Sequence, residues 1–226
     1  MALLIYVNDI VLAGNNTYAC SEFKAYLHAC FNIKDLGPLK YFLGIEVTRG
    51  PKGLFLSQRE YALEIVDECR LLGAKPSDFP IQANHKLARA IGSPLENVRR
   101  YRRLVGHLIY LTITHPDLCY AVHKLSQFMQ APRKEHMNAA CRALRYIKGT
   151  VDCGLLLWAP NDLTLVSYCD SNWGACLLTR RSLTRYLVTL EGSPISWKTK
   201  KQTTVSRPLL RPNTILWPLL QASWYG

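Results

Sequence analysis

The spacing of hydrophobic residues changes twice along the chain, and this limits the folds that it can adopt. Near the N-terminus, short apolar runs are separated by turn residues, which predicts β-hairpins. Between Tyr101 and Gly149 apolar residues recur at helical spacing. After Gly154 the period becomes two, which predicts strands near 155–158, 163–170, 186–190 and 195–198. The expected fold class is therefore α/β, of the α+β kind.

Two apolar runs at the N-terminus, 3–7 and 10–13, predict the first hairpin. Asn8 and Asp9 lie between them and form a polar pair suited to a tight turn. A carboxylate is thus expected at the hairpin tip. A helix is expected to follow at about 21–30.

A second hairpin is predicted from arms at 41–48 and 54–56, because glycine and proline lie between them. Ser57 stands three positions before Glu60, the spacing of a capping box, in which each side chain bonds to a free N–H of the first helical turn. A helix is therefore expected from Ser57 until Gly73 ends it.

The chain is strongly basic, with 28 Lys and Arg against 16 Asp and Glu, a net charge of +12 and a pI near 9.4. Such a charge favours a polyanionic partner, with nucleic acid as the first candidate, because binding releases counterions. A basic protein with a solvated positive surface is an equal alternative on charge alone. The candidate nucleic-acid-binding residues form two clusters, Arg99, Arg100, Arg102 and Arg103 around Tyr101, and Lys198, Lys200 and Lys201.

The eight cysteines are scattered and include no C-x-x-C pair, which favours reduced thiols over disulfides and disfavours a zinc site. The apolar start lacks a basic leader and is too short to cross a membrane. We therefore expect an intracellular protein, in the cytoplasm or nucleus, that is neither secreted nor membrane-bound.

Five groups of residues share an order and spacing that chance would hardly produce. They are the Tyr-Val-Asn-Asp segment 6–9, the segment 34–45, the segment 104–111, the Leu-Arg-Tyr-Ile-Lys-Gly-Thr segment 144–150, and 168–173 together with 195–207. In this arrangement the chain, from about Leu3 to Arg207, resembles the Pol polyprotein of copia-type long-terminal-repeat retrotransposons. The resemblance implies the end of a reverse transcriptase joined to the start of an RNase H.

The resemblance also implies a division into domains. Residues 1–80 correspond to a C-terminal palm and thumb fragment of the reverse transcriptase, and 81–151 to a helical connection. Residues 152–207 correspond to the N-terminal part of an RNase H-like mixed sheet, left incomplete. An RNA/DNA hybrid is the implied partner.

For the polymerase, the family implies a Tyr-x-Asp-Asp hairpin that holds two Mg²⁺ or Mn²⁺ ions with a third carboxylate. Asp9 matches the second aspartate of this motif, whereas Asn8 stands where the first is expected. An amide offers only a neutral oxygen, so the site loses one negative charge. The third carboxylate is expected on an earlier strand, ahead of the hairpin at which this chain starts. The ancestral metal ions are therefore not expected to bind productively.

For the RNase H, the resemblance implies that Asp170 is the first catalytic, metal-binding carboxylate. In a strand, Leu165, Ser167 and Cys169 share one face and Asp170 points to the other. The next carboxylate is expected directly after Arg207, where the family reads Ser-Ser-Ala-Glu-Ala-Glu-Tyr. We interpret 208–226 as a frameshifted tail, because codons permitted by this chain also permit those family residues after a one-base shift. The genomic codons test this hypothesis, since stops or unrelated residues in the shifted frame would exclude it.

Further departures from the family occur at single positions. Asn172 replaces an expected aspartate, and Arg185 falls in a run that replaces Ser/Thr-Thr-Gly. His115 replaces an arginine, and we interpret it as a capping or surface histidine. The expected function is reverse transcriptase and RNase H by descent, without present activity. The alternatives are a non-enzymatic nucleic-acid-binding relic and an unstable pseudogene product.

Overall fold

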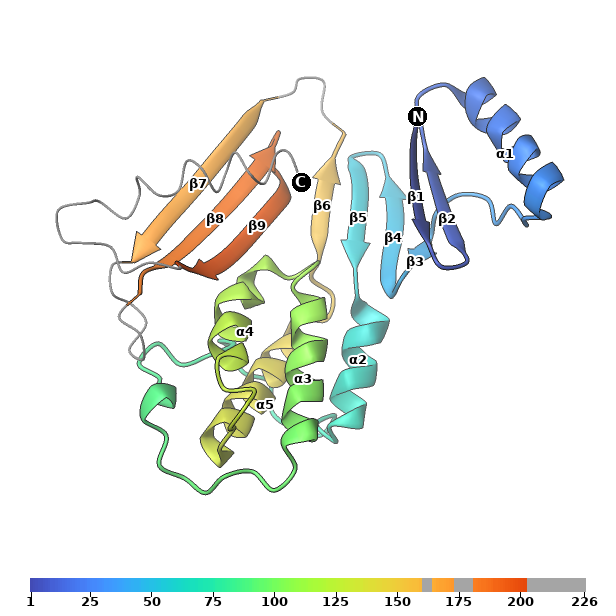
Figure 1. The fold of residues 1–226 in the computed structure, drawn as a ribbon. Helices are drawn as coiled ribbons and strands as arrows, with labels where there is room; N and C mark the ends of the chain where they lie inside the picture. The colour runs from blue at the N-terminus through green and yellow to red at the C-terminus, as the bar shows by residue number, and fades with distance from the viewer. Residues whose placement is uncertain (160–163, 173–180, 203–226) are drawn as a thin grey trace.

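The computed structural model describes residues 1–159, 164–172 and 181–202 (Figure 1). The interpreted tail at 208–226 lies outside these residues, as do Trp173 and 203–207. The described strands are β1 Ala2–Tyr6, β2 Asp9–Ala13, β3 Tyr41–Phe42, β4 Ile45–Gly50, β5 Gly53–Ser57, β6 Leu155–Trp158, β7 Leu165–Asn172, β8 Leu183–Leu190 and β9 Ser193–Lys201. The described helices are α1 Thr17–Phe31, α2 Arg59–Glu68, α3 Val98–Leu111, α4 Cys119–Ser126 and α5 Lys134–Gly149, with short 3-10 helices at Leu87–Arg89 and Pro116–Leu118.

The described strands form three separate antiparallel sheets, ordered β1-β2, β3-β4-β5-β6 and β7-β8-β9. Figure 1 shows the sheets side by side, with the first and third at opposite ends and helices α2 to α5 beneath. The mixed α+β class expected from the sequence is confirmed. Within the described ranges, no helix is both long and apolar enough to span a membrane.

The hydrophobic core lies among α2, α3, α4 and α5. It is formed by the side chains that the helical spacing predicted, and its fully buried members include Ile65, Tyr101, Leu108, Leu111, Leu125, Leu144 and Ile147. The Tyr101 hydroxyl donates to the carbonyl of Leu125 at 2.8 Å, so this buried polar atom is satisfied. The helical spacing after Tyr101 also predicted Val105, Leu108 and Ile109 to be buried, and Ile109 differs, because it is 44% exposed.

A long connection crosses the surface between α2 and α3 and is fastened to α5 by His136. The backbone N–H of Arg133 donates to His136 Nδ1 at 2.8 Å, and His136 Nε2 lies 3.0 Å from the carbonyl of Leu87. Nδ1 must accept, so the proton lies on Nε2 and is donated to Leu87. The imidazole also stacks on Phe128, with 4.0 Å between ring centroids.

Strand β6 joins the helices to the second sheet. It pairs with β5 through Leu54 and Leu157, about a hundred positions apart in sequence. The pairing is close at Gly53, where an added Cβ would collide with the Leu157 carbonyl and where φ is +140°. Glycine is required there for both reasons. The strand at 155–158 therefore extends the sheet of the second hairpin.

The first hairpin is present, but its turn lies one residue earlier than expected. Val7 and Asn8 occupy the turn, and Asp9 is the first residue of β2, paired with Tyr6. Val7 has φ +49°. A positive φ at the first turn residue gives a turn whose twist matches that of the flanking strands. Asp9 is therefore a strand residue beside the tip, and only Asn8 of the pair belongs to the turn.

Two other local expectations were wrong. The arm predicted at 41–48 is two antiparallel strands, because Leu43 and Gly44 both have positive φ and reverse the chain. The capping box at Ser57 does not form, since Gln58 is the N-cap and makes no side-chain capping bond. The free N–H of Glu60 instead donates to a carboxylate oxygen of Glu46 at 2.9 Å.

His115 was expected to cap a helix or lie on the surface. It does stand at the N-cap position of the 3-10 helix Pro116–Leu118, but the surface location is wrong. Its side chain is buried, with 2% of the residue exposed, and it makes no side-chain capping bond to the helix that follows. Burial lowers the pKa of His115, and Asp117, with 3.9 Å between Nδ1 and Oδ1, opposes this only in part. The neutral imidazole is therefore the form that fits the core.

Burial on α3 can be tested with two adjacent residues. Leu108→Ala removes a fully buried side chain and is expected to lower the free energy of unfolding by about 2–5 kcal/mol, from lost transfer energy and the cavity left behind. Ile109→Ala changes the exposed neighbour and should cost about 0.5 kcal/mol. Urea unfolding followed by circular dichroism measures both, and equal losses would contradict the described packing of α3.

His115 should make stability depend on pH. Its folded pKa lies below the unfolded value of about 6.5, so the unfolded chain takes up the proton first. The stabilising contribution is complete above about pH 6.5 and is lost as pH falls from there toward the folded pKa. His115→Gln should flatten the decline in unfolding free energy between about pH 7 and 5. An unchanged slope in urea titrations at those pH values would refute this assignment.

Candidate functional site

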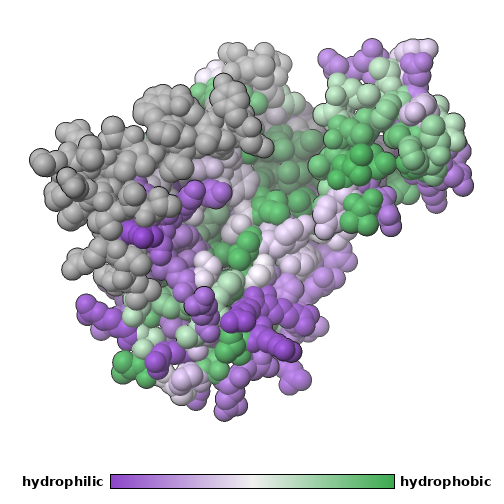
Figure 2. Space-filling view, viewed as in Figure 1, coloured by the Kyte–Doolittle hydropathy of each residue, from purple (hydrophilic) through white to green (hydrophobic). Residues whose placement is uncertain are grey.

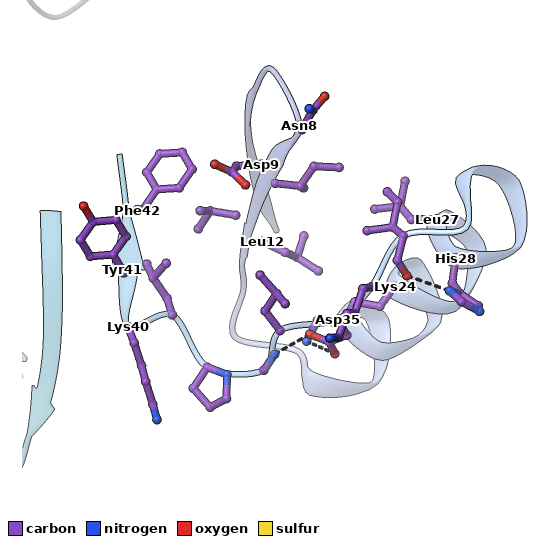
Figure 3. Close-up of a pocket in the computed structure, with 18 of the residues that line it drawn as sticks. Asn8, Asp9, Leu12, Lys24, Leu27, His28, Asp35, Lys40, Tyr41 and Phe42 are labelled. Atoms are coloured by element: carbon purple, nitrogen blue, oxygen red, sulfur yellow. Dashed lines mark hydrogen bonds and ion pairs between the residues drawn. The ribbon is translucent and has the colours of Figure 1, made fainter. Parts of the chain in front are cut away.

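The tip of the first hairpin places Asn8 and Asp9 on different sides. Both side chains are exposed. In Figure 3, Asn8 points outward at the tip, while the Asp9 carboxylate points back toward Phe42 on β3. The structure therefore does not aim the Asn8 amide and the Asp9 carboxylate at one point.

A cavity of about 1120 Å³ lies beside this hairpin, between β2, α1, the segment 32–40 and β3 (Figure 3). Most residues of its wall are apolar, but charged and polar residues, Asp9 among them, also line it. Residues of the wall include Asp9, Ile10, Leu12, Leu27, Ile33, Leu36, Leu39 and Phe42. The sequence did not reveal this cavity, because segments more than thirty residues apart form its wall.

A second carboxylate of the cavity wall, Asp35, is already engaged. Lys24 Nζ lies 3.0 Å from Asp35 Oδ2, and the Gly37 N–H donates to Oδ1 at 2.9 Å. The Gly37 N–H, followed by Lys24, lowers the pKa of Asp35. In the described part of the chain Asp9 has no such partner, so Asp9 is the one carboxylate of this wall that is open to a ligand.

The described residues do not fit a two-metal site. Such a site needs several carboxylates that converge on the ions. Across the ranges that the structure describes, no three His, Cys, Asp or Glu side chains gather closely enough to hold a metal ion. At the hairpin, Asp9 supplies one carboxylate and Asn8 a neutral amide that points elsewhere.

Asp170 lies far from Asp9, in a different sheet at the other end of the molecule (Figure 1). It is exposed on β7, and its register partner on β8 is Arg185. Directly paired residues share a face of the sheet, so Asp170 and Arg185 lie on the same side. The two predicted catalytic aspartates therefore lie far apart in the structure.

The arginine cluster lies at the N-terminal end of α3, where Arg99, Arg100, Arg102 and Arg103 are all exposed. Arg103 pairs with Glu68 at 3.0 Å, and Arg102 Nε donates to the Met129 carbonyl at 2.8 Å. Among the described residues, Arg99 and Arg100 have no ion pair. These two side chains are therefore the members of the cluster that are open to an anion.

The three predicted lysines lie on β9 and do not share a surface. Lys198 and Lys200 are exposed and two positions apart, so they point to the same face. Lys201 points to the opposite face, in register with Leu183. Sequence proximity alone grouped these lysines, and the pleat of the strand separates them.

Apolar residues gather on the surface of the first hairpin, as Figure 2 shows at the upper right. On β1, Leu4 is 55% exposed and Ile5 59%, although they point to opposite faces. A strand that is apolar on both faces is usually covered on both. The sequence did carry this signal, since the run Leu3 to Tyr6 contains no polar residue.

A chain of aromatic side chains links the cavity to the helices. The Tyr110 hydroxyl donates to the carbonyl of Leu43 in the β3–β4 turn. Its ring packs edge-to-face on Tyr61, 5.2 Å between centroids, and the Tyr61 hydroxyl lies 2.8 Å from His107 Nδ1. Tyr110 therefore positions the turn that follows Phe42, the residue toward which Asp9 points.

Comparison with known proteins gives a consistent result. Residues 1–83 match a family described as reverse transcriptase (RNA-dependent DNA polymerase). The chain is 42% identical over 205 residues to the retrovirus-related Pol polyprotein from transposon RE2 of Arabidopsis thaliana, a match that covers 91% of this chain and 14% of the relative. It is 34% identical over 214 residues to the corresponding polyprotein from transposon TNT 1-94 of Nicotiana tabacum, covering 90% and 16%.

A shorter relative matches over most of its own length. This uncharacterized mitochondrial protein of Arabidopsis thaliana is 40% identical over 209 residues, which cover 92% of this chain and 86% of the relative. The chain thus spans about one seventh of the length of the Pol polyproteins that it matches. No solved structure matches it.

The role of Tyr110 can be tested by removing its hydroxyl. Tyr110→Phe leaves the Leu43 carbonyl without its donor and should lower the unfolding free energy by about 1 kcal/mol. Amide hydrogen exchange should rise selectively in the β3–β4 turn. Tyr18→Phe, an exposed tyrosine on α1, is the matched control and should change neither quantity. Unaltered exchange in the turn of the Tyr110 variant would show that the hydroxyl does not hold it.

Proposed function

The chain belongs to the Pol polyproteins of copia-type retrotransposons and contains part of their reverse transcriptase region, and we propose that it is a polymerase and RNase H by descent that no longer performs either reaction. One observation carries this proposal. At the hairpin tip Asn8 points away from Asp9, and it stands where the family resemblance implies an acidic residue.

The charge at the hairpin explains why this substitution matters. Reverse transcriptases generally use divalent metal ions, and Mg²⁺ and Mn²⁺ prefer charged oxygen ligands. With Asn8 neutral, Asp9 alone offers a negative charge, and the described residues supply no third carboxylate beside it. A single exposed carboxylate holds such ions too weakly to organise primer and nucleotide.

The RNase H part of the proposal rests on β7 to β9. Their antiparallel order, with Asp170 on the first strand, agrees with the first three strands expected of an RNase H-like sheet. The division at 1–80, 81–151 and 152–207 belongs to the same proposal. Strand β6 lies in the segment 152–207 but pairs with β5 in the segment 1–80, so these two segments do not fold independently.

A second candidate function is nucleic-acid binding without catalysis, in an intracellular compartment. The exposed Arg99 and Arg100, which have no ion pair among the described residues, favour it, because arginine contacts to phosphates need no metal ion. The net charge of +12 acts in the same direction. An RNA/DNA hybrid is the partner that the family suggests.

The proposal predicts hybrid binding without chemistry. With a labelled RNA/DNA primer–template, Mg²⁺ or Mn²⁺ should produce neither primer extension nor RNA cleavage. Binding should weaken as salt rises, with a linear fall of log K against log salt concentration. Metal-dependent extension by the wild-type chain would overturn the proposed loss of activity.

Two variants test where the hybrid binds. Arg99→Gln with Arg100→Gln should reduce the salt slope by roughly 1 for each phosphate that the protein no longer neutralises. Arg59→Gln removes the same kind of charge from a residue that is paired with Asp152 at 2.9 Å, and should leave the slope unchanged. Cooperative unfolding of each protein must accompany these results. A wild-type chain that does not unfold cooperatively would instead support the alternative of an unstable product. The exposed apolar surface of the first hairpin is consistent with that alternative.

A further inference from the structure

A group of positively charged and imidazole side chains surrounds Tyr120, where α4 meets the third sheet. The Arg185 guanidinium carbon lies 4.7 Å from the centroid of the Tyr120 ring, and Lys124 Nζ lies 5.5 Å from it. The ring of His85 is 6.4 Å away on the connection that precedes α3. Three segments far apart in sequence therefore meet at one aromatic ring.

Two more basic residues belong to this group. Burial, then Lys124 and then Lys201 lower the pKa of His123. Burial and Lys124 also lower the pKa of His85. His85, Lys124 and Arg185 lie around the Tyr120 ring. His123 follows Tyr120 by three positions on α4, so it lies on the same side of the helix, and Lys201 lies on β9, which packs against α4. These six residues are called the Tyr120 cluster.

The cluster contains buried polar nitrogen atoms that lack hydrogen-bond partners among the described residues. They are Arg185 Nε, His85 Nδ1 and His123 Nε2. Native proteins satisfy nearly all buried polar groups, and an unsatisfied one calls for an unseen water or ion. Arginine can only donate, so an acceptor is needed at Arg185.

No described carboxylate fills this need. Asp170 is the acidic residue nearest to Arg185 by strand register, and it shares the same face of the sheet. It is nevertheless exposed, and within the described ranges no ion pair joins it to Arg185. The guanidinium instead lies over Tyr120.

We propose that the Tyr120 cluster binds a phosphate group, held by the Arg185 guanidinium together with the cations and imidazoles around it. A phosphate carries several acceptor oxygens and a negative charge, which match the arginine fork and a lysine point charge. Water would satisfy single nitrogen atoms but would not offset the positive charge of Arg185. Arg185 also stands where the family resemblance implies glycine, so the resemblance itself does not account for this side chain.

The phosphate can come from a nucleic-acid backbone or from free phosphate. The first source rests on the proposed nucleic-acid binding and deepens it, because it adds a contact beside Asp170. The second source is independent of that function. Both use the same oxygen chemistry, and two experimental arms separate them.

The first arm uses inorganic phosphate. A ligand that binds only the folded chain raises its unfolding midpoint, so phosphate should stabilise the wild-type protein relative to chloride at equal ionic strength. Arg185→Gln should weaken this apparent affinity by at least about tenfold. Lys75→Gln removes an exposed charge outside the cluster and should leave it unchanged. Equal phosphate stabilisation of wild-type and Arg185→Gln proteins would overturn the inference.

The second arm repeats the comparison with an RNA/DNA hybrid. If Arg185→Gln weakens binding of both ligands, the site takes a backbone phosphate; if it weakens phosphate binding alone, the site takes free phosphate. Absence of hybrid binding by the wild-type chain, with phosphate stabilisation intact, would refute the proposed nucleic-acid binding and leave this inference standing. Where Arg185→Gln fails to unfold cooperatively, His123→Gln replaces it, with the same expected direction and the same contradicting outcome.

Discussion

Burial of α3 among α2, α4 and α5 is the constraint on which the rest of the structure depends. The buried side of this helix carries Tyr101, Leu104 and Leu108, and its C-terminal end carries the attachments of two sheets. Tyr110 donates to the β3–β4 turn, and the indole N–H of Trp197 on β9 donates to the carbonyl of Thr112 at 2.8 Å. The last carbonyls of a helix lack partners within it, so Trp197 satisfies one of them while it anchors the third sheet.

The parts of this fold that sequence predicts well are those whose burial is decided locally. The stripe of Tyr101, Val105 and Leu108 indicates α3 because a helix brings residues three and four apart to one side. The turn at Val7 and Asn8 was misplaced by one residue, because strand register decides which residues form it. The pairing of β5 with β6 spans about a hundred residues and leaves no periodic trace in the chain.

The same distinction applies to the candidate sites. Motif position made Asp9 and Asp170 candidates. Strand alternation correctly predicts that neighbouring side chains point to opposite faces, as for Lys200 and Lys201. Whether separate motifs meet in space is a tertiary question, and Asp9 and Asp170 lie in different sheets. The sequence did not reveal the Tyr120 cluster. Its members come from segments that look unrelated in sequence and meet only in the folded structure.

The departures from the family pattern change the charge in a consistent direction. The family resemblance implies aspartate where Asn8 and Asn172 stand and glycine where Arg185 stands, and relative to that pattern each residue raises the net charge by one unit. His115 opposes them by one, since it replaces an arginine and is neutral in the core. In the proposed function, the positions that the resemblance assigns to metal binding therefore carry less negative charge, while Arg185 of the third sheet is a cation that lacks a carboxylate partner among the described residues. The proposed loss of metal-dependent chemistry and the proposed contact with phosphate thus both follow from the same direction of charge change.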